Sequence, residues 1–327
     1  MITLDLAGAK DDEALRRLLR DNPLPGRVTL AYHREPSFFR AAALEGDVHQ
    51  TLVGRTAEGG IMGLGTRSER PAWLLGQPAR VGYLGGLRVD ARYRGQHGML
   101  PQAWRYLHQL HQAGTCPVYL TTIVADNRPA RRLLEAGLPG FPRYRVLDTL
   151  VTLVVGTGEP EAARMDRGST HSVADIVRLQ PTDSLAPRWT AETLLADGLA
   201  PQDFILDGSG GCTAVWDQRH LKQHVVLEGS AVGLPAGPLA LAFLSHLSSP
   251  HETGVMALIH EARREAANRG IRYLCLGLPG RHRYRTLLNR FSGLTYESII
   301  YAVHWEDGAE LAARLQSQPL HVEVALL

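Results

Sequence analysis

The chain has 327 residues, of which 44% are hydrophobic and 21% charged, and its formal net charge is +2. These values are typical of a globular protein with two ordinary domains, and no apolar run approaches the roughly 20 residues that cross a bilayer. The near balance of acidic and basic residues excludes the strongly basic surface of a nucleic-acid-binding protein. Because the N-terminus also lacks the pattern of a secretory signal, we expect a cytoplasmic protein without nucleic-acid or membrane partners.

The three cysteines give no sign of a disulfide framework or a metal centre. Cys116, Cys212 and Cys275 lie far apart, and none forms a CxxC pair or a cluster with zinc-ligand spacing. We therefore expect buried free thiols and no metal site.

In the first 155 residues, helical and strand periodicities alternate. Helices are predicted over residues 11–22, 100–114 and 128–137, and strands over 26–36, 48–70 (a hairpin), 78–89, 116–127 and 143–155. The hairpin turns at Gly59 and Gly60, since paired glycines supply the dihedral angles of a tight turn. The order α, several β, α, β, α, β predicts a mixed α/β sheet flanked by helices.

Periodicity then fails over residues 156–175, where glycine, charge and small residues dominate, so we predict a linker there. Beyond it the earlier order returns, with strands at 212–226, 238–247, 271–279 and 295–306 and helices at 252–270 and 281–291. A repeat of about 150 residues indicates a duplicated domain rather than a solenoid. We therefore predict two tandem α/β domains, 1–155 and 176–327. After a helix at 308–318, the alternating stretch 319–327 predicts a last strand that completes a sheet.

The turn "LRVDARYRGQHGML", residues 87–100, connects a predicted strand to a predicted helix and contains Arg92, Arg94, Gly95 and Gly98. Backbone N–H groups at such a place lack partners, and the helix dipole adds positive charge. Glycine lets the backbone approach a phosphate closely, and arginine adds charge. The P-loop and the dinucleotide fingerprint are both missing, so an ordinary tight connection is an alternative on these residues alone.

With the downstream stretch "YLTTIVADNRPARRLLEAG", this segment resembles the centre of the GCN5-related N-acetyltransferase (GNAT) superfamily. Val89, Arg94 and Gly95 match the family's strand-and-turn motif, and Asn127 and Ala130 match its later N-x-x-A motif. The resemblance covers residues 80–155, with a fainter echo at 240–305. It implies two tandem GNAT-like domains, and the tandem layout is similar to that of the mycothiol synthase and aminoglycoside-acetylating branches.

The resemblance implies that acetyl-CoA, or another acyl-CoA, binds with its pyrophosphate on the turn. The turn residues concerned are Arg94, Gly95, Gln96, His97, Gly98 and Met99. The pantetheine arm would add to the strand edge at Leu87, Arg88 and Val89, with Asn127 on its other side. An amine would attack the thioester directly, a strand N–H would stabilise the oxyanion, and a base would remove the proton.

Several positions depart from the family pattern. His97 and Met99 stand where small residues are usual, which leaves open a one-residue shift that keeps the cradle or a degraded site. Leu134 stands where the family often has a tyrosine that acts as general acid toward the thiolate. Tyr83 stands where some members carry a glutamate base. Tyr83 is the candidate catalytic residue, as an acid or through a water, against the alternative of a packed strand tyrosine; Tyr144 is an open case of the same kind.

Other candidates have simpler explanations. His108 and His111 are three apart on one predicted helix, but no third ligand follows, so we expect an exposed polar face. The glycines of 208–212 predict a hairpin turn, and the basic run 281–285 a solvated helix start, with contact to a phosphate or an acidic substrate as the alternative. Residues 248–254, the second turn, have no arginine and carry a glutamate. We therefore assign the cofactor to the first domain only.

The sequence thus predicts an acyltransferase that moves an acetyl or other acyl group from acyl-CoA to an unidentified amine acceptor. The second domain would shape the acceptor pocket or hold a partner, and the oligomeric state is open. One alternative is a non-catalytic protein that senses acyl-CoA or binds a partner on a degenerate fold. Another is a peptidyl transferase that uses aminoacyl-tRNA, which the small net charge disfavours.

Overall fold

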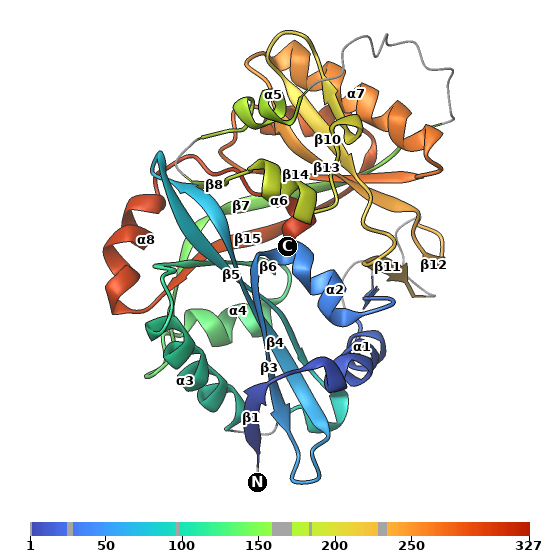
Figure 1. Cartoon of the computed structure of the whole chain (residues 1–327). Coiled ribbons are helices and arrows are strands. Elements are labelled where there is room, and N and C mark those ends of the chain that lie inside the picture. The colour runs from blue at the N-terminus through green and yellow to red at the C-terminus, as the bar shows by residue number, and fades with distance from the viewer. Residues whose placement is uncertain (1, 25–28, 96–97, 159–171, 183–184, 228–233) are drawn as a thin grey trace.

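The computed structural model describes residues 2–24, 29–95, 98–158, 172–182, 185–227 and 234–327 (Figure 1). A twelve-stranded mixed sheet runs in the order β1-β3-β4-β5-β6-β15-β7-β14-β13-β10-β9, with β8 paired to β4. Its strands are β1 (Thr3–Leu6), β3 (Val48–Arg55), β4 (Ile61–Leu74), β5 (Gln77–Val89), β6 (Tyr119–Val124), β7 (Arg143–Gly156), β8 (Leu185–Pro187), β9 (Phe204–Leu206), β10 (Cys212–Trp216), β13 (Leu241–Ser248), β14 (Tyr273–Pro279) and β15 (Gly293–His304).

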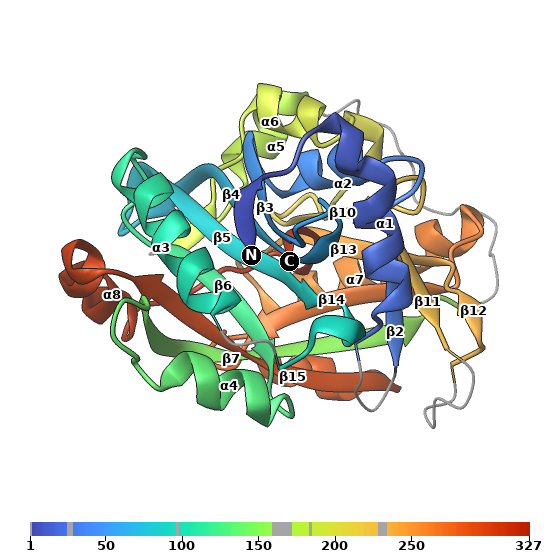
Figure 2. The ribbon, with the colours of Figure 1, turned by 90° about the horizontal axis from the view of Figure 1, so that it is seen from below.

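Eight α-helices flank the strands in the described part of the chain. They are α1 (Asp12–Asp21), α2 (Phe38–Ala42), α3 (Met99–Gln112), α4 (Arg128–Glu135), α5 (Val173–Arg178), α6 (Ala191–Ala196), α7 (Glu252–Asn268) and α8 (Ala309–Leu315). Helices α1 and α2 lie on one face of β3–β5 and α3 lies on the other, while α4 lies beside β7 (Figure 2). Within the described residues, no helix is both long and apolar enough to cross a membrane.

The two halves of the chain share one sheet because they exchange strands. Strand β15, from near the end of the chain, lies between β6 and β7, and β7 lies between β15 and β14. The β15–β7 register runs from Gly293↔Val155 to His304↔Arg143, with one irregularity near Ile300. Backbone hydrogen bonds therefore join the halves along the length of both strands.

A smaller sheet joins the halves a second time. It has the order β12-β11-β2, with β2 at Leu30–His33, β11 at Gln223–Val226 and β12 at Gly237–Pro238. An apolar cluster lies between the halves and combines Ala41 and Leu44 with Trp189, Trp216 and Leu241. These contacts fix how the first half faces the second.

Five predicted helices are confirmed, as α1, α3, α4, α7 and α8. The predicted strand 212–226 is instead two strands, β10 and β11, in different sheets. The predicted helix 281–291 contains a 3-10 helix at Arg285–Arg290. The glycine-rich stretch 208–212 is a hairpin turn, as expected, since β9 and β10 pair antiparallel on either side. Residues 159–171 of the predicted linker lie outside the described residues.

The predicted strand at 319–327 is wrong. Leu320 makes one isolated bridge with Leu185, and Val324–Leu326 form a 3-10 helix. This C-terminal segment runs between the halves, where Gln218 Nε2 donates to the Ala325 carbonyl at 3.1 Å and Val324 packs on β14. The apolar residues of 319–327 alternate because the segment contacts both halves, and not because it pairs with a neighbouring strand.

The contact of Val324 with β14 gives a stability test. A Cβ added at Gly277 would lie 2.3 Å from Val324 Cγ2, whereas one added at Gly156 would meet no atom within 4 Å. Gly277→Ala should lower the free energy of unfolding by about 1–3 kcal/mol through overpacking, and Gly156→Ala should change it by less than about 0.5 kcal/mol. Urea denaturation measures both; equal values would contradict the packing of the C-terminal segment on β14.

Candidate functional site

Strands β5 and β6 begin side by side and then separate. Their parallel pairing consists of Gly82↔Tyr119 and Tyr83↔Leu120. One step further, Thr121 Oγ1 donates to the Leu84 carbonyl at 2.7 Å. From there β5 continues to Val89, paired with β4 alone. The separation leaves an edge of β5 open at the residues where the resemblance places a pantetheine arm.

A bulge shapes this open edge. The β4–β5 register shifts between Leu64 and Thr66, and opposite it Gly86 has φ +64°, a conformation that favours glycine. The Leu87 side chain, next along the strand, is 48% exposed. Arg88 folds back so that its Nη1 donates to the Leu87 carbonyl at 2.8 Å, and its guanidinium carbon lies 5.9 Å from the centre of the Tyr32 ring. Burial lowers the pKa of Arg88.

The turn after β5 is held by side chains of its own. The Asp90 carboxylate accepts from the Arg92 backbone N–H and pairs with the Arg92 guanidinium, and Asn22 Oδ1 accepts from the Ala91 N–H. Arg94 is exposed and forms no ion pair with a described residue. Of the two arginines in this turn, Arg94 is therefore the one whose charge is uncommitted.

Two glycines direct the backbone into α3. Gly95 has φ +84° and Gly98 has φ +103°. The backbone of a residue with a side chain would be strained at either value. At the start of α3 the Gln102 N–H donates to the Gly98 carbonyl, and no described residue accepts from the N–H groups of Gly95, Gly98 or Met99. Gln96 and His97 lie outside the described residues.

The Met99 side chain points away from the turn. It packs on β3 and β4, where a Cβ at Gly54 would lie 2.6 Å from the Met99 sulfur and one at Gly63 would lie 3.4 Å from its methyl carbon. The two glycines therefore make room for the methionine. Met99 stands where small residues are usual in the family, but its side chain does not cover the backbone amides of the turn.

Asn127 precedes α4 as its N-cap, and Leu134 lies within the helix. The Asn127 side chain is exposed and caps the helix, accepting from the Ala130 N–H at 3.3 Å. Leu134 is buried in an aromatic cluster with Trp104, Tyr119 and Tyr301. Tyr144 packs edge to face against Trp104 and Tyr301, and burial raises the pKa of its hydroxyl.

Tyr83 lies on the face of the sheet opposite to this aromatic cluster, at the point where β5 and β6 separate. Its hydroxyl shares a hydrogen bond with Thr122 Oγ1 at 2.9 Å. Burial raises the pKa of Tyr83 to about 12, and the charge of Glu45 adds to the effect. The phenol therefore keeps its proton near pH 7 and cannot serve as a base there.

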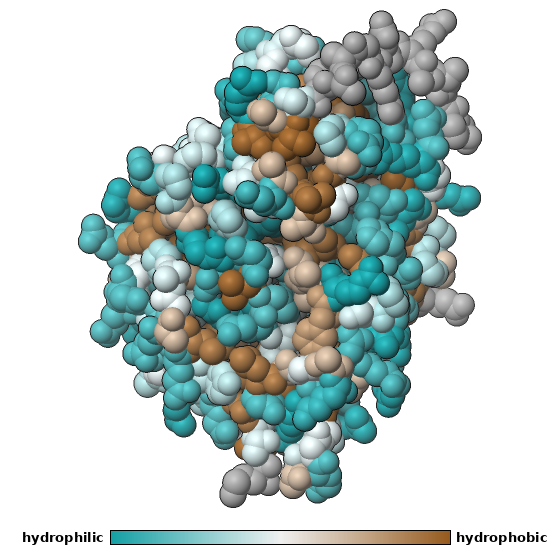
Figure 3. Space-filling model, viewed as in Figure 1, coloured by the Kyte–Doolittle hydropathy of each residue, from teal (hydrophilic) through white to brown (hydrophobic). Residues whose placement is uncertain are grey.

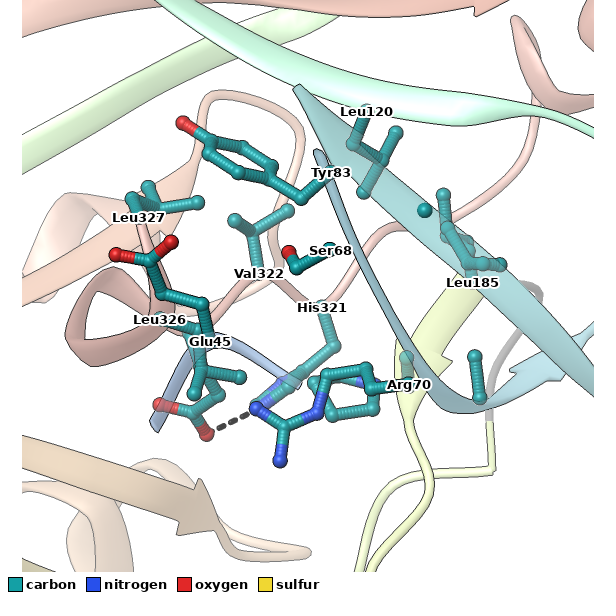
Figure 4. Close-up of a pocket in the computed structure, with 16 residues that line it drawn as sticks. Glu45, Ser68, Arg70, Tyr83, Leu120, Leu185, His321, Val322, Leu326 and Leu327 are labelled. Atoms are coloured by element: carbon teal, nitrogen blue, oxygen red, sulfur yellow. Dashed lines mark hydrogen bonds and ion pairs between the residues drawn. The ribbon is translucent and has the colours of Figure 1, made fainter. Parts of the chain in front are cut away.

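Tyr83 lines a cavity of about 60 Å³ between the two halves (Figure 4). Its apolar wall includes Val81, Leu120, Leu185, Val322 and Leu326, and its polar lining residues are Glu45, Ser68, Arg70, Tyr83, His321 and Glu323. Tyr83 and Arg70 lie at opposite ends in the view of Figure 4. The cavity lining thus extends from Tyr83, beside the strand separation, to Arg70.

The charged groups beside the cavity come from both halves. Glu45 pairs with Arg34 at 2.5 Å and lies 3.5 Å from Lys222 Nζ. Burial alone would raise the pKa of Glu45, but Arg34, Lys222 and His49 lower it below its usual value. Burial lowers the pKa of Lys222 to about 8. Sequence reasoning missed this cluster, although Lys222 is one of only two lysines in the chain.

The corresponding position in the second half is filled. Strands β13 and β14 also begin parallel, at Leu241↔Tyr273, and His246 repeats the positive φ of Gly86 at +56°. Its buried ring packs 4.0 Å from the centre of Trp189, and its backbone N–H donates to Glu323 of the C-terminal segment at 2.7 Å. A side chain and a chain segment therefore occupy the space that β5 and β6 leave open.

The turn of the second half is also occupied. Arg283 Nη2 donates to the Ser249 carbonyl and the Tyr284 hydroxyl donates to the Pro250 carbonyl. Arg283 and Tyr284, both within the basic run 281–285, thus hold this turn by hydrogen bonds.

The expectation that His108 and His111 form an exposed polar face is wrong. His111 is buried, stacks on Trp305 at 4.7 Å and lies 2.9 Å from Asp307 Oδ2, and His108 stacks on the same indole at 5.1 Å. The helix face is covered by a segment that follows β15. In the described residues, no group of three histidine, cysteine or acidic side chains is arranged to hold a metal ion.

Solved structures with a similar fold exist, although the sequences are distant. A scan against protein-family models finds no match, and neither does a comparison with curated proteins. Two structures of Saccharomyces cerevisiae N-myristoyltransferase with bound myristoyl-CoA match with TM-scores of 0.64 and 0.63, each at 11% identity. The alignments cover 93% and 92% of this chain and 79% and 82% of those chains.

A GCN5-related N-acetyltransferase from Sphaerobacter thermophilus aligns with a TM-score of 0.49 and 13% identity, over 92% of this chain and 95% of that chain. The likeness to the two myristoyltransferase structures shows the fold, and it spans both halves of the chain. The mixed α/β sheet flanked by helices is the arrangement that the resemblance implied. The chain therefore has a GNAT-like fold.

Proposed function

We propose that this chain transfers an acyl group, in the simplest case acetyl, from acyl-CoA to an amine acceptor. The observation that carries the proposal is the continuity of the open β5 edge with the turn at Gly95 and Gly98. The unpaired amides at the turn would hold the pyrophosphate, and Arg94 would add charge. The strand edge at Leu87–Val89 would hold the pantetheine arm.

In this proposal the two halves divide the work. The first half, residues 1–155, binds the donor, and the second half, residues 176–327, supplies a wall of the acceptor cavity through Leu185 and Val322. The closed position around His246 supports a single donor site among the described residues. Asn127, which caps α4, would contribute through the geometry of that helix end or by turning its side chain toward the arm.

Packing on both faces of the sheet supports a short acyl group. On the α3 and α4 face, the separating strands cover the close-packed cluster of Trp104, Tyr119 and Tyr301. On the other face, the cavity of about 60 Å³ is well below the roughly 300–1,000 Å³ of pockets for larger ligands. This packing favours a two-carbon acyl group over a long acyl chain.

Tyr83 would act as the acid of the reaction. The free amine attacks the thioester carbonyl, a tetrahedral intermediate forms, and the C–S bond breaks as the amide forms. The leaving thiolate takes a proton from the Tyr83 hydroxyl, and the proton lost by the amine returns through solvent to Tyr83. Its position at the strand separation, beside Thr122, supports this role.

The turn can be tested by direct binding. Gly95→Val should weaken acetyl-CoA binding at least tenfold in calorimetry, because a β-branched side chain is strained at φ +84° and would cover the amides. Gly210→Val is the matched control, since Gly210 has φ +93° in the β9–β10 turn. Equal affinities for acetyl-CoA in the two variants would contradict the cradle.

The role of Tyr83 can be tested by kinetics. Tyr83→Phe should lower kcat by about 10²-fold, within the usual range for a general acid, and should leave the Kd for acetyl-CoA unchanged. Tyr144→Phe, which removes another buried hydroxyl, should keep kcat within about twofold. Thiol release over an amine panel measures both.

The pH profile gives a further check on Tyr83. Because its pKa is raised to about 12, the hydroxyl keeps its proton through the range in which amines become free bases. The wild-type rate should therefore rise with pH and show no decline from loss of this proton below about pH 10. A decline centred near pH 7 in the wild type and absent from Tyr83→Phe would contradict the assignment.

A further inference from the structure

Buried donor atoms without partners belong to Arg70, which lines the cavity, and to Arg34 and Lys222, which lie beside the lining residue Glu45. Arg70 Nε and Nη1, Arg34 Nη1 and Lys222 Nζ are all buried and make no hydrogen bond to a described residue. Lys222 Nζ lies 3.5 Å from Glu45, beyond the usual 2.7–3.2 Å of such bonds. Unpaired cationic donors in an interior are costly, so such groups call for an acceptor.

The acidic groups nearby are already engaged. Asp197 Oδ2 accepts from Arg70 Nη2 at 3.0 Å, and Glu45 accepts from Arg34. Glu323 Oε1 accepts from the His246 backbone N–H at 2.7 Å and lies 3.0 Å from His321 Nε2. These carboxylates leave the Nε and Nη1 donors of Arg70 unsatisfied.

Arg70 is held firmly in place at this end. Its guanidinium carbon lies 4.8 Å from the centre of the Trp189 ring, and its other terminal nitrogen is held by Asp197. Besides burial, repulsion from Arg34 and Arg70 contributes to the lowered pKa of Lys222, so each of these arginines lies close enough to act on the lysine. A rigid cation with free donors, in a lined cavity, is a preorganised site for an anion.

The dimensions of the cavity limit the size of that anion. About 60 Å³ exceeds the space for a single water but is far below that of a large ligand pocket. Tyr83, where the thioester would arrive, lies at the far end of the same cavity from Arg70 (Figure 4). A ligand that spans the two ends has an amine at one end and an anionic group at the other.

We propose that the cavity binds a small amine acceptor that carries a carboxylate, an α-amino acid in size and chemistry, with Arg70 as the residue that holds the carboxylate. The inference rests on the proposed function, because it places the acceptor amine toward Tyr83 and the donor thioester. Arg70 is thus a specificity-determining residue for the acceptor.

The surface over this region agrees with a site shared by the two halves. In the space-filling view, apolar residues follow a band through the middle of the face, with hydrophilic residues on both sides (Figure 3). The C-terminus lies in this part of the same view in Figure 1, and Leu326 and Leu327 line the cavity.

The experiment compares each α-amino acid of a standard panel with its own amide. Thiol release from acetyl-CoA and calorimetric binding without acetyl-CoA are measured for every pair. At least one amino acid should bind and react with a kcat/KM at least tenfold above that of its amide. Arg70→Gln should reduce that ratio to near one, mainly through KM, and should leave the affinity for acetyl-CoA unchanged.

Two further variants separate recognition from folding. Arg188→Gln is the matched control, since Arg188 stacks on Trp73 at 5.5 Å but does not line the cavity, and it should leave the ratio unchanged. The double variant Arg70→Gln/Asp197→Asn removes the partner carboxylate as well, so the buried charge stays balanced, and it should show the same loss of preference as Arg70→Gln.

Two results would overturn the inference. One is that the amides bind or react as well as the acids; the other is that no amino acid binds or reacts in the wild-type protein. The affinity of the wild type for acetyl-CoA distinguishes these from failure of the proposed function. A protein that binds acetyl-CoA and accepts only uncharged amines retains the transferase proposal and loses the carboxylate site.

Discussion

The exchange of β7 and β15 is the constraint on which the rest of the structure depends. Because β15 pairs with β6 on one side and with β7 on the other, and β7 pairs with β14, the two halves share a continuous set of backbone hydrogen bonds. A cavity between independently mobile domains would change shape with their motion. Here the wall from Leu185 is fixed relative to Tyr83 by the pairing of β8 with β4, and the segment that carries Val322 is bonded to Leu185 through the His321 N–H.

The exchange also explains why β5 and β6 can separate without loss of order. Strand β6 is held by β15 from Tyr119↔Val303 to Val124↔Ser298, while β5 is held by β4 out to Val89. Each strand therefore keeps one full ladder after the pairing between them ends. The open edge costs the hydrogen bonds of one side only, and a ligand with amide groups can replace them. In the second half, His246 and the C-terminal segment fill the equivalent space.

Local chemistry made part of this structure predictable from the sequence. Gly95 and Gly98 mark a strand–turn–helix connection that glycine dihedral angles require, and the helices α1, α3, α4 and α7 follow from their own periodicity and end signals. The exchange of strands was not predictable in this way, because the pairing of β6 with β15 joins segments far apart in sequence. The same cause explains His111, whose partner Asp307 is 196 residues away.

The charged end of the cavity was missed for a related reason. Arg70 and Glu45 look like ordinary surface charges when read one at a time, and only the fold brings them to Lys222. The scarcity of lysine in an arginine-rich chain was a usable signal, because it singles out Lys222 as a position that differs from the other basic residues. The turn residues Gln96 and His97 remain predictions, as they lie outside the described residues.

The interleaved strands also determine when the protein can finish folding during its synthesis. Strand β6 ends at Val124, but its neighbour β15 begins at Gly293, more than 160 residues later. At a ribosomal rate of about 5–20 residues per second, the edge of β6 waits roughly 8–35 s for its partner. Throughout this interval the nascent first half presents an unpaired strand beside an aromatic core, a state in which chaperones or neighbouring nascent chains compete with the native partner.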